Sequence, residues 1–213
     1  TMEKILIIDT ETTNTLDDAL VYDIGYMVAD FDGNIYHKDS YTVSDIFLWK
    51  EIMKEAYFAD KIPMYWEDIK NGSRKLRRFT TIKFILHDVM EQYNITKVFA
   101  FNCRFDALAL GTTQRYITSS KYRYFFKYGT QFHDILKLAR NTFKNDEEYH
   151  KFCIENNYLT KYGKDRHTAE IVYRYLFNND FVESHTALED CEIEYQILLS
   201  CLEKNGNCDT LLW

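Results

Sequence analysis

The sequence has a single proline, Pro63, and only seven glycines among its 213 residues. We find no internal repeat, low-complexity tract or linker, and the length fits one domain with a continuous core. The five cysteines are an odd number and no two have C-x-x-C spacing, so neither a zinc site nor a disulfide framework is indicated. No signal peptide and no apolar run of roughly 18 residues is present, so we expect a cytoplasmic protein without a membrane partner (host cytoplasm if a phage encodes it).

Positive charge is also in short supply, because 26 Lys and Arg stand against 33 Asp and Glu, a formal net charge of −7. Such a charge disfavours a protein that binds long stretches of nucleic-acid duplex. It is less of an objection to an enzyme that grips one strand end, since acids that hold divalent cations make a site attractive to phosphate. Aromatic residues, in contrast, are abundant, with 17 Tyr, 15 Phe and 3 Trp. They supply core volume or stacking faces for unpaired bases, and composition does not distinguish the two.

Apolar periodicity alternates between strand and helix and predicts an α/β domain. An Asp-Gly turn at 32–34 predicts that the second and third strands form an antiparallel hairpin. We therefore expect a mixed central sheet of about five strands with helices on both faces. The predicted strands are 3–9, 21–30, 35–43 and 98–101, and the predicted helices are 45–60, 81–93, one from 106, 134–143, 167–177 and 186–204.

Acidic residues stand where the first predicted strand ends. Asp9 and Glu11 are two positions apart, so a strand would point both side chains to the same face. Two carboxylates that close repel each other unless a cation lies between them. Taken alone, such a pair is more often two solvated acids at a turn. Asp106, at the start of a predicted helix, is by itself an ordinary helix-dipole partner. A lone pair of His185 and Asp190 more often reflects helix capping and solvation than catalysis.

Together and in this order, three segments resemble the motifs of the DEDDh exonuclease superfamily, which includes proofreading subunits, RNase T-like enzymes and oligoribonucleases. The D-x-E motif matches D-T-E-T-T at 9–13, the N-x-x-F-D motif matches 102–106, and the H-x4-D motif matches 185–190. The segment H-D-I-L-K-L-A-R at 133–140 is similar to the family's D-T-L-x-L-A-R, and D-I-G at 23–25 is similar to its E-I-G. A histidine five residues before the last aspartate, in place of a tyrosine four before it, is typical of the histidine subtype.

The resemblance, which covers about residues 3–202, implies a ribonuclease H-like fold. It implies one DEDDh exonuclease domain at 2–205, followed by a C-terminal tail at 206–213. The implied activity is metal-dependent 3′-5′ hydrolysis of phosphodiester bonds at the 3′ end of single-stranded DNA or RNA, with release of nucleoside 5′-monophosphates.

By the same resemblance, four acids and one histidine form the active site. The acids are the metal ligands, and an all-carboxylate set suits two Mg²⁺ or Mn²⁺ ions. The histidine is the general base, because an imidazole accepts a proton near neutral pH. The residues implied are Asp9, Glu11, Asp106 and Asp190 as ligands, His185 as base, and Thr10, Asn102 and Phe105 as contacts to the terminal nucleotide.

The sequence leaves several points open. The basic and aromatic residues of 121–128 fit a strand-binding groove or core aromatics alternating with solvated cations. The basic cluster at 74–78 fits phosphate contact or a solvated helix entry, and Asp134 fits support of the site or a helix cap. The alternative function is a non-catalytic nucleic-acid-binding or polymerase-accessory module on the same fold, with 44–78 or the tail at 209–213 as its docking surface. A homodimer or a polymerase-type partner is a further alternative.

Overall fold

The computed structural model describes residues 2–13, 18–119, 121–206 and 210–212. Its centre is one mixed sheet in the order β4-β3-β2-β1-β5-β6. The second strand is antiparallel to both its neighbours, which confirms the predicted hairpin, and the remaining pairs are parallel. The six strands, where about five were expected, are β1 (Lys4–Thr12), β2 (Val21–Asp30), β3 (Ile35–Val43), β4 (Leu76–Arg77), β5 (Lys97–Ala100) and β6 (Gln131–Asp134).

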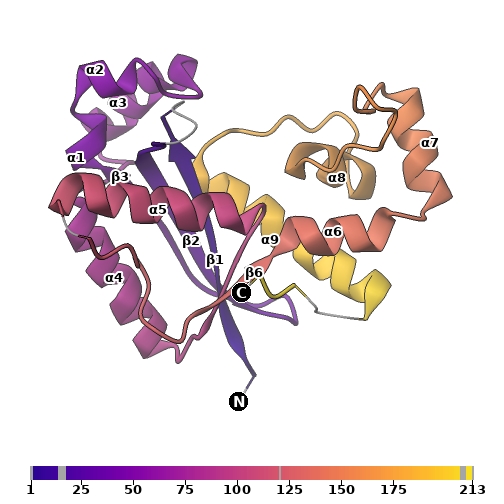
Figure 1. Ribbon diagram of the computed structural model, residues 1–213, viewed down its shortest axis with the longest axis horizontal. Helices are drawn as coiled ribbons and strands as arrows, with labels where there is room; N and C mark the ends of the chain where they lie inside the picture. Colours follow the sequence, from indigo (N-terminus) through magenta and orange to yellow (C-terminus); the bar gives the residue numbers. More distant parts are fainter. Residues whose placement is uncertain (1, 14–17, 120, 207–209, 213) are drawn as a thin grey trace.

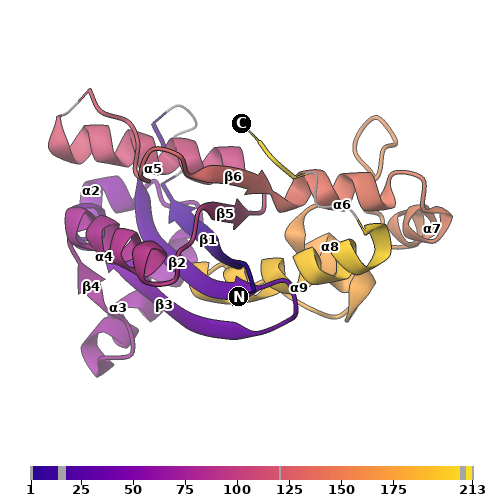
Figure 2. The same ribbon diagram turned by 90° about the horizontal axis from the view of Figure 1, so that it is seen from below.

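Helices cover both faces of this sheet, as predicted (Figures 1 and 2). One face carries α1 (Ser44–Phe47), α2 (Lys50–Met53), α3 (Ile62–Asn71), α4 (Phe79–Gln92) and α5 (Cys103–Thr118). The other carries α6 (Ile135–Phe143), α7 (Glu147–Glu155), α8 (Ala169–Leu176) and α9 (Ala187–Asn205). Strand β1 serves both cores because its side chains alternate in direction. Leu6 and Ile8 join the first hydrophobic cluster, and Ile5 and Ile7 join the second.

The predicted helix at 45–60 is wrong. The chain forms the two short helices α1 and α2 and then pairs with the end of β1. The Tyr57 N–H donates to the Thr12 carbonyl at 3.1 Å, and Ala56 forms a β-bridge with Thr13. A backbone N–H that is used in this way cannot also serve a helix. The chain continues into a 3-10 turn, η1 (Ala59–Lys61), and α3, and this path brings Phe58 to the carboxyl end of β1.

The apolar pattern does not predict β4, β6 or α7, because each is short or lies in a polar stretch. Tertiary pairing defines β6, which runs beside β5 from Gln131 to Asp134. The described part of the tail extends this edge: the Leu212 N–H donates to the Phe132 carbonyl at 2.7 Å, and Thr210 is fully buried. The remaining tail positions 207–209 and 213 lie outside the described residues. Within the described chain, no helix has the length and apolar character needed to cross a bilayer.

Candidate active site

A cleft of about 600 Å³ opens where the ends of β1, α5 and α9 meet. Strand β1 contributes its carboxyl end, and the two helices contribute their first turns and the residues that precede them. All eight residues that the sequence singles out line this cleft: Asp9, Thr10, Glu11, Asn102, Phe105, Asp106, His185 and Asp190. The fold therefore gathers three distant motifs in one place, and the functional roles of their residues stay predictions.

Three of the carboxylates converge. Oxygen atoms of Asp9, Glu11 and Asp190 all lie within 4.8 Å of one another. Asp9 and Glu11 share one face of β1 because alternate strand residues point the same way, and Asp190 comes from the first turn of α9. Asp106 lies beside them on the cleft wall, where its Oδ1 accepts hydrogen bonds from the Thr10 backbone N–H at 3.1 Å and hydroxyl at 2.7 Å. The Thr10 hydroxyl is thus engaged in holding an acid.

Burial raises the pKa of each of these acids, and repulsion between them adds to the effect on Asp9 and Glu11. The pKa rises to about 9 for Glu11, about 8 for Asp190 and about 7 for Asp106, and that of Asp9 lies well above its usual range. Among the described residues, no basic side chain forms an ion pair with any of the four. The donors are all hard oxygen atoms, so the set fits divalent cations such as Mg²⁺ or Mn²⁺.

Strand β2 holds the start of α9 against the sheet. The buried Asp23 accepts a hydrogen bond from the Ala187 backbone N–H at 3.3 Å and pairs with Arg74 at 3.3 Å. Two positions along, a Cβ on Gly25 would lie 2.4 Å from the Ala187 carbonyl carbon, so a residue without a side chain is required there. The D-I-G segment therefore allows the first turn of α9, which carries Asp190, to approach the end of β1.

Asp134 caps a helix and also holds the backbone next to the cleft, the two roles that the sequence left open. Its Oδ1 accepts the Leu136 N–H at 3.1 Å and so caps α6. The same oxygen accepts the backbone N–H groups of Asn102 at 2.9 Å and Cys103 at 3.3 Å. These bonds hold the turn before α5, where Asn102 has a left-handed φ of 64°. Since Asp106 lies in the first turn of α5, Asp134 also helps to place that acid.

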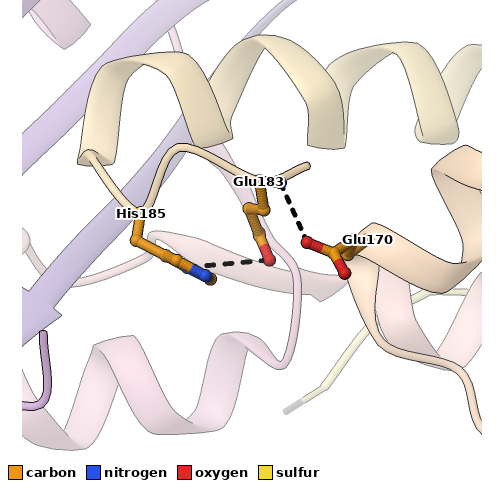
Figure 3. A group of neighbouring side chains, drawn as sticks. All are labelled: Glu170, Glu183 and His185. Atoms are coloured by element: carbon orange, nitrogen blue, oxygen red, sulfur yellow. Dashed lines mark hydrogen bonds and ion pairs between the residues drawn. The ribbon is translucent and has the colours of Figure 1, made fainter. Parts of the chain in front are cut away.

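The ring of His185 lines the same cleft but is grouped with other acids. It stacks on Phe58, with ring centroids 3.8 Å apart and 10° between the planes. Its Nδ1 lies 3.8 Å from the Glu183 carboxylate, and Figure 3 shows Glu170 beside this pair. The backbone of His185 has a φ of 54°, which residues other than glycine seldom adopt. Burial lowers the pKa of His185, which favours the neutral imidazole that accepts a proton.

Glu194 is a fifth carboxylate at this cleft, and the sequence motifs do not single it out. It follows Asp190 by four residues on α9, so the two side chains share one helix face. Glu194 is 3% exposed, and its Oε2 accepts the Phe101 backbone N–H at 3.3 Å. Burial, with repulsion from Asp106 and Asp190, raises the pKa of Glu194 well above its usual range. The i, i+4 spacing of two acids on a buried helix face was the signal that could have revealed it.

The two basic segments differ in how far their side chains contact other parts of the protein. In the cluster at 74–78, Arg74 pairs with Asp23 and Asp68, and Lys75 pairs with Asp39 at 2.7 Å. In the segment at 121–128, Phe125 and Phe126 are buried in the first hydrophobic cluster, and the cations around them are exposed. Tyr122, Tyr124 and Tyr128 of the same segment are exposed, so only part of it follows the pattern of core aromatics, and a role in strand binding stays a prediction.

Neither a protein-family model nor a curated protein sequence matches this chain. Solved structures do. The crystal structure of E. coli exonuclease I in complex with a dA16 oligonucleotide matches with a TM-score of 0.60 and 11% identity, covering 96% of this chain and 41% of that one. The chain has the fold of the part of exonuclease I that it covers. The ribonuclease H-like arrangement of a mixed sheet between helices is thereby confirmed.

Two further structures agree. The zinc ion bound form of the E. coli exonuclease I–ssDNA complex matches with a TM-score of 0.60 and 11% identity, covering 98% of this chain and 42% of that one. Exonuclease I from Methylocaldum szegediense matches with a TM-score of 0.57 and 14% identity, covering 97% and 42%. This chain thus spans less than half the length of the exonuclease I chains it resembles. At these identities the likeness is one of fold.

Proposed function

We propose that this chain is a metal-dependent nuclease of the DEDDh type. It removes nucleotides from the 3′ end of single-stranded DNA or RNA and releases nucleoside 5′-monophosphates. The observation that carries the proposal is the cleft in which Glu11, Asp106 and Asp190 lie buried beside the half-buried Asp9, with no basic partner among the described residues. The shared fold with exonuclease I, whose structures include complexes with single-stranded oligonucleotides, supports it.

The four acids would hold two divalent ions, Mg²⁺ or Mn²⁺. Hard cations prefer carboxylate oxygen, whereas zinc favours the imidazole and thiolate ligands that these four residues do not offer. When bound, the ions activate water, neutralise charge on the phosphodiester and stabilise the departing 3′ oxygen. Because the pKa values of the acids are raised by burial, ion binding should release protons. The same cations would remove the repulsion between the carboxylates.

His185 is the proposed general base. Its lowered pKa keeps the imidazole neutral at physiological pH, so the ring can take a proton from the attacking water. The ring stacks on Phe58 in the wall of the cleft that the acids also line. Phe105, which is 42% exposed on the cleft wall, offers a face on which the terminal base can stack. Asn102 is exposed beside it as a polar contact.

Digestion of a 5′-labelled single strand tests the proposal. With Mg²⁺ or Mn²⁺ we expect stepwise shortening that stops with EDTA, on a strand with a free 3′ end but not on a circle. Asp9→Asn should abolish shortening, and His185→Gln should slow it by about 10²- to 10⁴-fold. Asp32→Asn, a matched change at the exposed hairpin turn, should leave the rate unchanged. Absence of shortening of both DNA and RNA with either metal would overturn the proposal.

A non-catalytic strand-binding or polymerase-accessory module is the second candidate. The observation in its favour is that the His185 ring groups with Glu170 and Glu183 and not with the acids of β1. This candidate predicts strand binding that is retained in EDTA, without any product. A catalytic protein gives product, so the same digestion separates the two.

A further inference from the structure

The cleft continues past the acids into a second pocket of about 530 Å³. Arg140, Thr160, Asp165 and His167 line both hollows, so the two are contiguous. The second pocket is walled by the end of α6, by α7 and by the loop at 159–165, which lie on the side of the molecule away from α1–α4 (Figure 1). Apart from Arg140, which ends the H-D-I-L-K-L-A-R segment, no motif in the sequence points to this region, most of which is the polar stretch between α6 and α8.

The loop that forms one wall of this pocket is well braced. The Thr160 N–H donates to the Lys164 carbonyl at 2.7 Å, and the Gly163 N–H donates to the Thr160 carbonyl at 2.9 Å. Leu159 and Asp165 close the loop with a β-bridge. Gly163 makes the turn possible with a φ of 73°, in a region where glycine carries no strain. The side chain of Lys164 therefore projects from a fixed backbone position.

Positive charge gathers around this pocket without being neutralised. Arg140 and Lys144 come from the end of α6, and Lys164 comes from the loop. None of the three forms an ion pair with an acid of the described chain. Asp165, the acid in the pocket wall, is engaged with His150 at 2.8 Å. The pocket is thus a cationic hollow.

Some exposed cations elsewhere on the surface have partners. Lys38 pairs with Glu192, Lys75 with Asp39 and Lys127 with Glu91. In a chain with a net charge of −7, three unpaired cations around one hollow produce a local field that attracts anions. Arg166 lines the adjoining cleft wall and adds a further cation there.

We infer that this cationic pocket binds backbone phosphates of the substrate strand, on the 5′ side of the terminal nucleotide. The inference rests on the proposed function, which places the scissile phosphate at the acids. A strand held there continues along the cleft, and Arg140, Lys144 and Lys164 face its next phosphates. The recognised group is the phosphodiester, which DNA and RNA share, so the pocket carries no sugar preference. A dinucleotide has one phosphate, which is the scissile phosphate at the acids. The pocket therefore contributes to binding only for longer strands.

The test is the charge-reversal variant Lys144→Glu/Lys164→Glu, assayed on dinucleotides and 12-mers of dT and rU. Both lysines are exposed, so the fold should be retained. For both 12-mers we expect kcat/KM to fall by about tenfold or more, because each lost phosphate contact weakens strand binding. Cleavage of the dinucleotides should stay within about twofold of the wild type, since the variant leaves the acid site intact. A milder variant, Lys144→Gln/Lys164→Gln, should give an intermediate loss.

Lys50→Glu/Lys70→Glu is the matched control, because it makes the same change of charge at two exposed lysines outside the pocket and the cleft. It should leave all four substrates unaffected. An unchanged 12-mer rate in the pocket variant, an equal loss on dinucleotides, or a loss confined to dT or to rU overturns the inference. So does a loss in the control alone, since that would place the strand on the face formed by α2 and α3.

The inference can fail separately from the proposed function. If no strand is shortened, binding of a fluorescent 12-mer by anisotropy in Ca²⁺ still tests the pocket. The affinity should fall in the pocket variant, and the slope of log Kd against log salt should decrease by about 1.4, or about 0.7 for each of two phosphates. Equal affinity in wild type and variant would show that the strand takes another path.

Discussion

Replacing Asp190 with asparagine should make the metal-free protein more stable, although it removes a proposed metal ligand. Asp190 is 4% exposed, and its carboxylate lies within 4.8 Å of those of Asp9 and Glu11. Asparagine has the same shape and keeps an Oδ1 that can accept the Ser184 hydroxyl, 3.4 Å away. The change therefore removes an ionisable group from the cluster and leaves packing and this hydrogen bond in place.

The size of the effect follows from the pKa of the buried carboxyl. Burial, with repulsion from Glu183, raises the pKa of Asp190 from 3.8 to about 8. The unfolded carboxyl ionises at lower pH, so stability falls as pH rises from about 4 to about 8 and is constant outside this window. At pH 7, about three units above 3.8, the loss is at most about 4 kcal/mol. We expect the variant to recover about 2–4 kcal/mol, or roughly 10 °C in Tm for a domain of this size.

Urea denaturation of EDTA-treated protein at pH 5, 7 and 9 measures this effect. The stability of the wild type should fall across the series, and that of Asp190→Asn should fall less. Mn²⁺ should reverse the order, because an ion that binds the folded wild type more tightly adds RT ln(1 + [L]/Kd) to its stability. Asp32→Asn, on the exposed hairpin turn, should change neither result. A metal-free Asp190→Asn protein that is less stable than the wild type at pH 7 would refute the reasoning.

Three further predictions follow from single contacts. Glu194→Gln keeps an acceptor for the Phe101 N–H but removes a carboxylate. The Mn²⁺ affinity measured by calorimetry should therefore fall by roughly tenfold, about 1.4 kcal/mol, and an unchanged affinity would contradict this prediction. Phe58→Leu exposes the His185 imidazole, so the lowered pKa of His185 should rise toward 6.5 in an NMR titration, and the acid limb of the kcat–pH profile should move to higher pH. An unchanged pKa would show that burial against Phe58 does not cause the shift. Gly25→Ala should cost about 2–3 kcal/mol in urea denaturation, because its Cβ would lie 2.4 Å from backbone of α9; a wild-type midpoint would argue against the close contact.

Much of this fold could be predicted from periodicity and turn chemistry. The buried run that becomes β1, the Asp-Gly hairpin and the amphipathic α4, α6 and α9 are local signals, and each is found within a few residues of its predicted position. The acids could be predicted because the strand rule places Asp9 and Glu11 on one face. Their convergence with Asp190 could be expected only from the family resemblance, since nothing local to residues 185–190 says which strand the helix meets.

The elements that could not be predicted depend on partners far away in the sequence. The path at 56–58 is set by the end of β1, which takes the Tyr57 N–H away from a helix. The strand at Gln131–Asp134 exists because β5 offers an open edge. The cationic pocket needs Lys144 and Lys164 to be brought together by a loop whose turn depends on Gly163. Each of these features lies next to the cleft, so the local rules fail where substrate contacts are proposed.

The charge distribution also removes the main compositional objection to a nucleic-acid substrate. The net charge of −7 includes four buried carboxylates at the cleft and the half-buried Asp9. The unpaired cations Arg140, Lys144 and Lys164 lie in the adjoining pocket. Without divalent ions, the acid end repels a phosphate strand that the basic end attracts. With ions bound, both ends attract it. Strand affinity and metal affinity should therefore be linked, and by reciprocity a bound strand must raise metal affinity by the same factor as the metal raises strand affinity.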